Sequence, residues 1–273
     1  MRIVARRLSR LDAELVRRGL ARSRDHAAGL IAAGRVEVHG VAASKAATSV
    51  DADASVRVTI DDADPGYASR GGHKLAGALD AFPGVVVDGR RCLDAGASTG
   101  GFTDVLLRSG AEKVVAVDVG YGQLAWSLRT DERVEVIDRT NVRTLTPEAI
   151  GGEADLTVAD LSFISLPVVL PALVACTRDN GDLLPMVKPQ FEVGRERLGA
   201  KGVVRDPMHR AEAVVRVAKF AAGLGWRTRG VVRSPLPGPS GNVEFFLWLR
   251  HDETPGLDAA EITRIVTTDG DAA

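Results

Sequence analysis

The sequence is poor in cysteine, and it has no long apolar run. Its 273 residues include only two cysteines, Cys92 and Cys176, which stand far apart in apolar surroundings. Because protein zinc sites need closely spaced ligands, we expect no metal site, and two isolated thiols are typical of a reduced, cytoplasmic protein. No apolar stretch approaches the ~20 residues that cross a bilayer, and no signal peptide is evident. We therefore expect a cytoplasmic protein that does not associate with membranes.

Charge is nearly balanced overall but unevenly distributed. The net charge is −1, yet residues 1–45 contain ten lysines and arginines against four acids, so this segment carries +6 and the remainder −7. A small basic segment joined to a larger acidic one predicts an anionic partner for the first, with nucleic acid the best candidate. The apolar content of 45% is enough for the core of one large domain with a small companion.

The basic segment predicts two short helices and a small hairpin. Apolar residues recur at helical spacing over 6–20, and a serine-capped run over 23–33 stops at Gly34. Strands are expected near 35–41 and 55–60. The segment resembles the S4 RNA-binding domain through Arg10-Leu11-Asp12, Gly19 to Arg24, Gly34-Arg35-Val36, Val38-His39-Gly40 and Lys45. Together with the basic charge, this resemblance predicts phosphate contacts from Arg6, Arg10, Arg18, Arg22, Arg24, Arg35 and Lys45. The alternative is an ordinary solvated basic surface.

From residue 70 onward, predicted strands and helices alternate, which indicates an α/β fold with a mainly parallel sheet covered on both faces. Two further strands, near 228–232 and 243–249, follow each other without a helix, as in the antiparallel edge hairpin of a class I methyltransferase. We expect an S4 domain at 1–60, an acidic linker at 61–69, a Rossmann-like methyltransferase domain at 70–250 and a polar tail at 251–273. The five parallel strands are expected near 91–95, 113–118, 134–138, 156–160 and 182–188.

A glycine loop, residues 94–102, connects the first of these strands to a helix. Such a turn lets the backbone pass close to a nucleotide-like ligand. A dinucleotide loop would have glycine where Ser98 stands, and the pattern D-x-G-x-x-x-G is typical of S-adenosylmethionine (SAM) methyltransferases. Asp118 ends the next strand, where it can accept ribose hydroxyls, and Asp138 suits the adenine amino group, although either acid could instead cap a turn. The expected SAM-binding residues are Asp94, Gly96, Ser98, Thr99, Gly100, Phe102, Asp118, Asp138 and Asp160.

Two lysines and two acids indicate the type of reaction. Lys188 ends an apolar strand, and a partly desolvated lysine near other cations can accept a proton because its pKa falls. Glu244 lies in another apolar strand and needs a cation, which Lys74 or Lys188 could supply. In chain order, Lys74, Asp160, Lys188 and Glu244 resemble the K-D-K-E tetrad of FtsJ-like RNA 2′-O-methyltransferases. The alternative is that two or more of them are ordinary surface charges.

With the S4-like segment in front, residues 5–250 resemble the TlyA (hemolysin A) family of ribosomal RNA 2′-O-methyltransferases. The family implies methylation of the ribose 2′-hydroxyl of a cytidine in 16S or 23S rRNA, within 30S or 50S subunits. Relatives that modify both subunits make ribosomes sensitive to capreomycin. Relatives can also carry an Arg-x-Trp-Val linker tetrapeptide that couples the two domains. Here the corresponding residues are Pro65-Gly66-Tyr67-Ala68, so whether that coupling operates stays open.

Other functions fit the sequence less well. Methyltransferases that act on base amines usually carry an Asn/Asp-Pro-Pro-Tyr/Phe motif after the fourth strand, where this chain has Asp160-Leu161-Ser162-Phe163. Hemolysin-like lysis would need membrane-spanning segments, and none is evident. An S4-type RNA-binding protein that only senses SAM would not need the tetrad. The basic residues of the loop 191–206 are expected either to contact phosphates or to be solvated. We expect a monomer, because no strong exposed apolar stripe is present.

Overall fold

The structure is a computed structural model, and it describes residues 8–21, 24–59, 65–238 and 240–268. The chain divides into two compact units, Met1–Ser69 and Arg70–Ala273. Each unit has its own buried apolar cluster.

The first unit packs two helices, α1 (Leu11–Arg17) and α2 (Arg24–Ala32), against short strands. Leu11, Leu15 and Ile31 form the centre of its core. The strand order is β3-β2-β5 in one sheet and β1-β4 in the other, and all pairs are antiparallel. The strands are β1 (Leu8–Arg10), β2 (Val36–Val38), β3 (Val41–Ala42), β4 (Ser49–Asp51) and β5 (Val56–Val58).

One detail of this unit differs from the sequence prediction. The helix expected over 6–20 begins only at Leu11, because the three residues before it pair with β4 as strand β1. Strands this short carry no clear two-residue alternation, so the apolar spacing alone could not reveal them. The serine cap expected at residue 23 lies outside the described residues.

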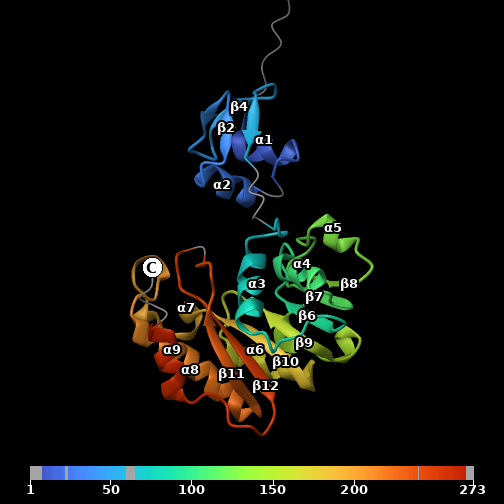
Figure 1. Ribbon diagram of the computed structural model, residues 1–273, viewed down its shortest axis with the longest axis vertical. Coiled ribbons are helices and arrows are strands. Elements are labelled where there is room, and N and C mark those ends of the chain that lie inside the picture. Colours follow the sequence, from blue (N-terminus) through green and yellow to red (C-terminus); the bar gives the residue numbers. More distant parts are fainter. Residues whose placement is uncertain (1–7, 22–23, 60–64, 239, 269–273) are drawn as a thin grey trace, which may run out of the picture. The chain divides into compact units, whose positions relative to one another are not determined.

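The second unit contains a sheet in the order β11-β12-β10-β9-β6-β7-β8 (Figure 1). The five strands from β10 to β8 are parallel, and β12 runs antiparallel to both of its neighbours. This is the predicted fold class. The strands are β6 (Arg91–Ala95), β7 (Lys113–Val117), β8 (Val134–Ile137), β9 (Ala154–Ala159), β10 (Thr177–Val187), β11 (Trp226–Arg233) and β12 (Phe245–His251).

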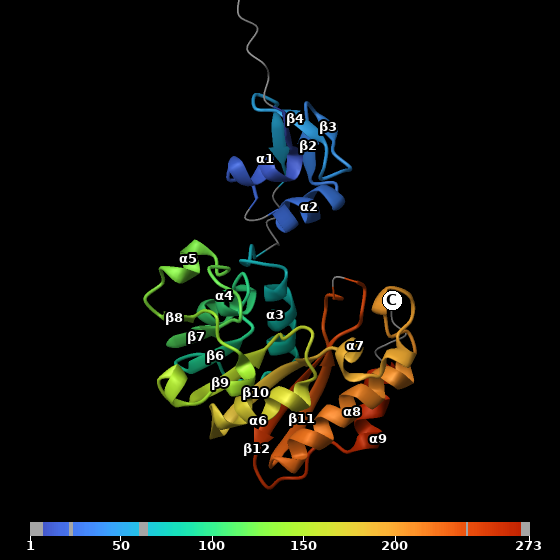
Figure 2. The same cartoon turned by 180° about the vertical axis from the view of Figure 1, so that it is seen from behind.

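Helices cover both faces of this sheet, as Figures 1 and 2 show from opposite sides. Helices α3 (Gly71–Ala81) and α4 (Gly101–Arg108) pack together on one face. Helices α6 (Leu166–Ala175), α8 (Pro207–Gly223) and α9 (Ala259–Thr268) contribute to the core of the other. The short helices α5 (Trp126–Arg129) and α7 (Pro189–Glu192) follow β7 and β10, and single 3-10 turns lie at Val142–Thr144, Glu148–Ile150, Arg195–Arg197 and Ala200–Gly202.

The prediction of a polar tail at 251–273 is wrong for the described residues up to 268. Helix α9 packs on α8 and buries Ile262 and Val266, which stand four residues apart on one helix face. Asp258 and Glu261 cap the helix reciprocally, since each side chain accepts from the backbone N–H of the other at 2.8 Å. Ile265 and Leu257, which are partly buried, pack against the same core and help to dock this helix.

Candidate active site

Lys188 and Asp160 come together at the carboxyl ends of two adjacent parallel strands. Lys188 directly follows β10 and Asp160 directly follows β9. The Lys188 Nζ atom lies 2.5 Å from Asp160 Oδ1 and donates a hydrogen bond to Ser162 Oγ at 3.0 Å. The Lys188 side chain is only 9% exposed. These two oxygens therefore replace most of the water that its ammonium group would otherwise need.

Lys74 and Glu244 form a second, more deeply buried pair. Lys74 lies in the first turns of α3, and its Nζ atom is 2.5 Å from Glu244 Oε2. Their side chains are 10% and 1% exposed. Of the two lysines that could neutralise Glu244, Lys74 does so. Glu244 does not lie inside a strand as expected, since β12 begins at the next residue.

The sheet register brings the two pairs to one edge. Val187 of β10 is paired with Phe245 of antiparallel β12. Lys188 follows the first of these residues and Glu244 precedes the second, so both leave the sheet at the same ladder position. All four predicted tetrad residues thus gather at the carboxyl edge of the sheet, where ligands of open α/β folds bind.

The glycine loop is shaped by positive φ angles and close backbone approaches. Gly96 and Gly100 have φ of +90° and +98°, and Ser98 adopts +48°. A Cβ at Gly96 would lie 2.7 Å from the Asp160 carbonyl oxygen, and one at Gly100 would overlap Leu128. Only glycine fits both positions without a shift of the surroundings.

Asp118 joins this loop to the end of β7. Its carboxylate accepts the backbone N–H groups of Ser98 at 2.8 Å and of Gly120 at 2.6 Å. Asp138, which follows β8, accepts from Arg129 at 3.0 Å and from the Gly122 N–H at 3.3 Å. Thr99, within the loop, is half-buried. Both acids remain partly exposed at the predicted positions, one strand apart.

Two predicted cofactor residues have buried side chains. Asp94 lies within β6 rather than at its end, is fully buried and accepts from Thr103 Oγ1 at 2.7 Å. Burial raises the pKa of Asp94 to about 7, an effect that the Thr103 hydroxyl opposes and Asp160 reinforces. Phe102 is 4% exposed and packs on Phe246, so only its backbone could reach a ligand.

These features together fit a nucleoside ligand. The loop cannot hold side chains at Gly96 and Gly100, so its backbone is free to approach a ligand closely, and two acids can accept hydroxyl or amino protons. Asp94 Oδ1, beneath the loop, is buried with no hydrogen-bond partner among the described residues. Sequence reasoning missed Ser162 as a partner of Lys188, although it is the polar residue nearest Asp160 in its loop.

The predicted RNA-binding residues have different environments. Arg6 and Arg22 lie outside the described residues. Arg10 and Arg24 both bond Asp12 and keep side chains that are 51% and 59% exposed. Lys45 is exposed, and Arg35 donates to the Thr59 carbonyl oxygen.

Arg18 is less exposed than Arg10 and Arg24, because contacts within the protein surround its guanidinium group. The group bonds Glu14 at 2.6 Å and three backbone carbonyl oxygens, and the side chain is 20% exposed. Arg17 and Arg18 together hold the pKa of Glu14 well below its usual range. Two buried acids, Asp12 and Glu14, bind these arginines, and their burial was not expected from the sequence.

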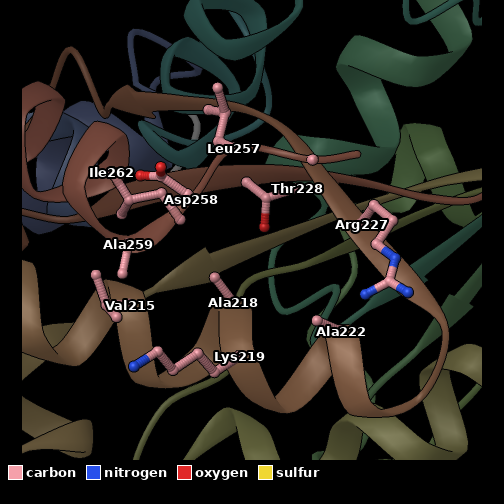
Figure 3. A pocket seen from close by; sticks show the side chains of 11 residues that line it. Val215, Ala218, Lys219, Ala222, Arg227, Thr228, Leu257, Asp258, Ala259 and Ile262 are labelled. Atoms are coloured by element: carbon pink, nitrogen blue, oxygen red, sulfur yellow. The ribbon is translucent and has the colours of Figure 1, made fainter. Parts of the chain in front are cut away.

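A cavity of about 190 Å³ lies apart from these residues, between α8, β11 and the start of α9 (Figure 3). Apolar side chains of Val215, Ala218, Leu257 and Ile262 line it, with Lys219 and Arg227 beside them. It contains none of the predicted site residues. In the described part of the chain, no helix is long and apolar enough to cross a membrane, and no cluster of side chains could hold a metal ion.

Comparison with known proteins finds matches over both units of the chain. The FtsJ-like methyltransferase family matches residues 67–251, and the S4 domain matches residues 9–56. The 16S/23S rRNA (cytidine-2′-O)-methyltransferase TlyA of Mycobacterium tuberculosis is 62% identical over 93% of this chain and 94% of its own. The 23S rRNA (cytidine-2′-O)-methyltransferase TlyA of Campylobacter jejuni is 37% identical over 67% and 70%. A solved structure described as a candidate hemolysin from Streptococcus thermophilus has a TM-score of 0.76 and 36% identity, covering 97% and 96%.

Proposed function

The chain belongs to the FtsJ-like methyltransferases, in the TlyA family with its S4 domain, and we propose that it methylates a ribose 2′-hydroxyl of a cytidine in ribosomal RNA. The observation that supports this most directly is the tetrad. Lys74, Asp160, Lys188 and Glu244 form two ion pairs at the sheet edge that also bears the glycine loop.

The methyl donor is SAM, whose sulfonium supplies a methyl group that is already activated. The backbone of the glycine loop would lie against it, with Asp118 binding the ribose hydroxyls and Asp138 the adenine amino group. The 2′-hydroxyl is a weak nucleophile, so its placement in line with the methyl group supplies much of the acceleration. We propose that Lys188, steered by Asp160, helps to deprotonate or to orient the hydroxyl. It can accept the hydroxyl proton only as a neutral amine, and as an ammonium group it orients the oxygen. Lys74 and Glu244 tune the local charge and help hold the substrate.

The first unit would bind a structured region of the RNA by its shape and phosphates. Arg10, Arg24 and Lys45 have exposed side chains that suit this role. In the loop 191–206, Lys201 and Arg205 are exposed and could add contacts, whereas Arg197 pairs with Glu212. The target base would have to leave its stack to reach the site, as for other enzymes that modify bases or sugars within folded nucleic acids.

The cellular setting follows from this substrate. We infer that the protein works in the cytoplasm on assembled 30S or 50S subunits, as a monomer. A role limited to sensing SAM, or a lytic role, would leave the tetrad without a use. For these reasons we favour methyl transfer over both.

The test is transfer of labelled methyl from SAM to purified 30S and 50S subunits from cells that lack the enzyme. We expect label on ribose, and its loss in Lys188→Ala, with the Kd for SAM changed by no more than about twofold. The matched control is Lys113→Ala, which removes an exposed lysine paired with Glu135 at the start of β7. Near-normal transfer by Lys188→Ala would refute its assignment, and no label on either subunit would refute the proposed substrate.

A further inference from the structure

Two short segments surround the Lys188 ammonium group, and neither belongs to the sheet. Residues 160–166 provide Asp160 and Ser162 after β9 has ended, and residues 188–192 begin with Lys188 after β10 has ended. The β9–β10 ladder brings Asp160 and Lys188 to one edge of the sheet, but its last pair is Pro185 with Ala159, so the ladder does not hold the rest of these segments together. A further contact between the segments can therefore help to keep Lys188 close to its two partners.

The Glu192 carboxylate makes that contact. Its Oε2 atom accepts the Ser165 hydroxyl at 2.6 Å, and its Oε1 atom accepts the Leu166 backbone N–H at 2.7 Å. Ser165 is the N-terminal cap position of α6, yet its own side chain makes no capping bond. Glu192 therefore satisfies one of the free N–H groups at the start of α6 from a different segment of the chain.

Neighbouring contacts anchor both ends of this bridge. Arg216 of α8 donates to the Glu192 carbonyl oxygen at 2.9 Å, so the far end of the 188–192 segment is tied to a long helix. The rings of Phe163 and Phe191, one from each segment, lie with centroids 5.3 Å apart. Glu192 itself is 4% exposed.

A buried carboxylate in this place has an energetic cost. Burial raises the pKa of Glu192, and the Ser165 hydroxyl, the Leu166 N–H and Arg216 oppose that rise. An uncompensated buried carboxylate would be strongly unfavourable. The two hydrogen bonds across the segments are therefore needed for Glu192 to remain buried, and they hold the segments together in turn.

We propose that Glu192 is a positioning residue for methyl transfer, which clamps segment 160–166 to segment 188–192 and so keeps Lys188 within reach of Asp160 and Ser162. Glu192 does not itself contact Lys188, and it acts through the geometry of the two segments. The inference rests on the proposed function for its catalytic consequence, while the clamp itself does not depend on it.

Three variants separate positioning from general support of the fold. Glu192→Ala removes both hydrogen bonds, and Ser165→Ala removes one. Glu192→Gln keeps both, because its amide oxygen can accept the Leu166 N–H while its amide nitrogen donates to Ser165 Oγ. Glu132→Gln, on an exposed turn, is the matched control.

The measurements are kcat and KM for methyl transfer, and the Kd for SAM. We expect Glu192→Ala to lower kcat about tenfold or more with SAM affinity within about twofold, and Glu192→Gln to recover to within about threefold of the wild type. Ser165→Ala should lie between them. The proposal is overturned if folded Glu192→Ala keeps its kcat, if SAM affinity falls in parallel, or if Glu192→Gln is as impaired as Glu192→Ala.

Hydrogen exchange at the Leu166 amide tests the clamp without any activity. We expect slow exchange in the wild type and in Glu192→Gln, and clearly faster exchange in Glu192→Ala. Unchanged exchange in Glu192→Ala would overturn the clamp, whatever the kinetics. If the wild type transfers no methyl group although its Leu166 amide is protected by Glu192, the proposed function fails and the clamp stands.

Discussion

The buried Lys74–Glu244 pair allows a sharp test of whether the tetrad serves stability, chemistry or both. In Lys74→Met, Glu244 would remain 1% exposed with neither carboxylate oxygen bonded, because Oε1 already lacks a hydrogen-bond partner among the described residues. Removing one partner of a buried ion pair costs about 3–5 kcal/mol. For a domain of this size, about 2–4 °C per kcal/mol predicts a fall in Tm of roughly 6–20 °C.

The assay is a double-mutant cycle in which the free energy of unfolding of each variant is measured by denaturant unfolding. Glu244→Leu alone leaves the buried Lys74 without its partner and should also destabilise the protein. Lys74→Met with Glu244→Leu replaces the pair by apolar groups, which is often neutral or even stabilising, so the double variant should be more stable than either single variant. We expect a coupling energy above about 2 kcal/mol. Additive losses would refute the conclusion that the two side chains form one buried unit.

Methyl transfer by the double variant separates stability from chemistry. If the pair tunes the site, the double variant should unfold like the wild type and bind SAM, yet transfer methyl groups much more slowly. Recovery of transfer together with stability would show that the pair is only structural, and Lys74 and Glu244 would then have to be removed from the catalytic assignment.

Three further predictions concern other parts of the molecule. As the pH rises from about 4 to 7, the wild type should lose stability relative to Asp94→Asn. The native-state pKa of Asp94 is raised from 3.8 to about 7, so the unfolded state releases this proton at a lower pH than the folded state does. A difference in unfolding free energy between the wild type and Asp94→Asn that does not change across this pH range would contradict the prediction. Gly100→Ala should weaken SAM binding, measured by calorimetry, because φ is +98° and the added Cβ overlaps Leu128. Unchanged affinity would contradict the role of the glycine loop in binding SAM. Arg18→Ala should lower the thermal stability of the first unit, whereas Lys45→Ala should leave it unchanged and reduce the salt dependence of RNA affinity by about one unit. If Lys45→Ala lowered the thermal stability and Arg18→Ala changed only the RNA affinity, Lys45 would be the structural residue and Arg18 the RNA contact.

The sequence predicted the architecture well because its signals were local and repeated. Five parallel strands, each followed by an acid, a lysine or a glycine turn, indicated both the fold and the edge at which the site lies. The order of Lys74, Asp160, Lys188 and Glu244 predicted their gathering. Which lysine neutralises Glu244 depends on the position of helix α3, which carries Lys74, because the β10–β12 register by itself brings Lys188 to the same edge. No spacing within one strand could reveal this.

What the sequence could not predict depends on contacts between distant residues. The sequence could not assign a role to Glu192, because its contacts with Ser165 and Leu166 depend on the fold. The burial of Asp12 and Glu14 among arginines was not predicted from the sequence. Helix α9 was missed because its two buried residues stand in a polar stretch, and only the apolar surface of α8 gives them a place to pack.

The C-terminal segment also protects an edge of the sheet. Strand β11 has β12 on one side only, and Leu257 donates to the Thr228 carbonyl oxygen on the open side, while Arg229 holds the carbonyl oxygens of Thr254 and Pro255. An uncovered strand edge is a template on which further copies of a chain can pair and aggregate. A protein shortened to residue 250 would retain every tetrad residue and yet expose that edge together with the apolar side of α8. Its failure in an assay would reflect insolubility rather than lost chemistry.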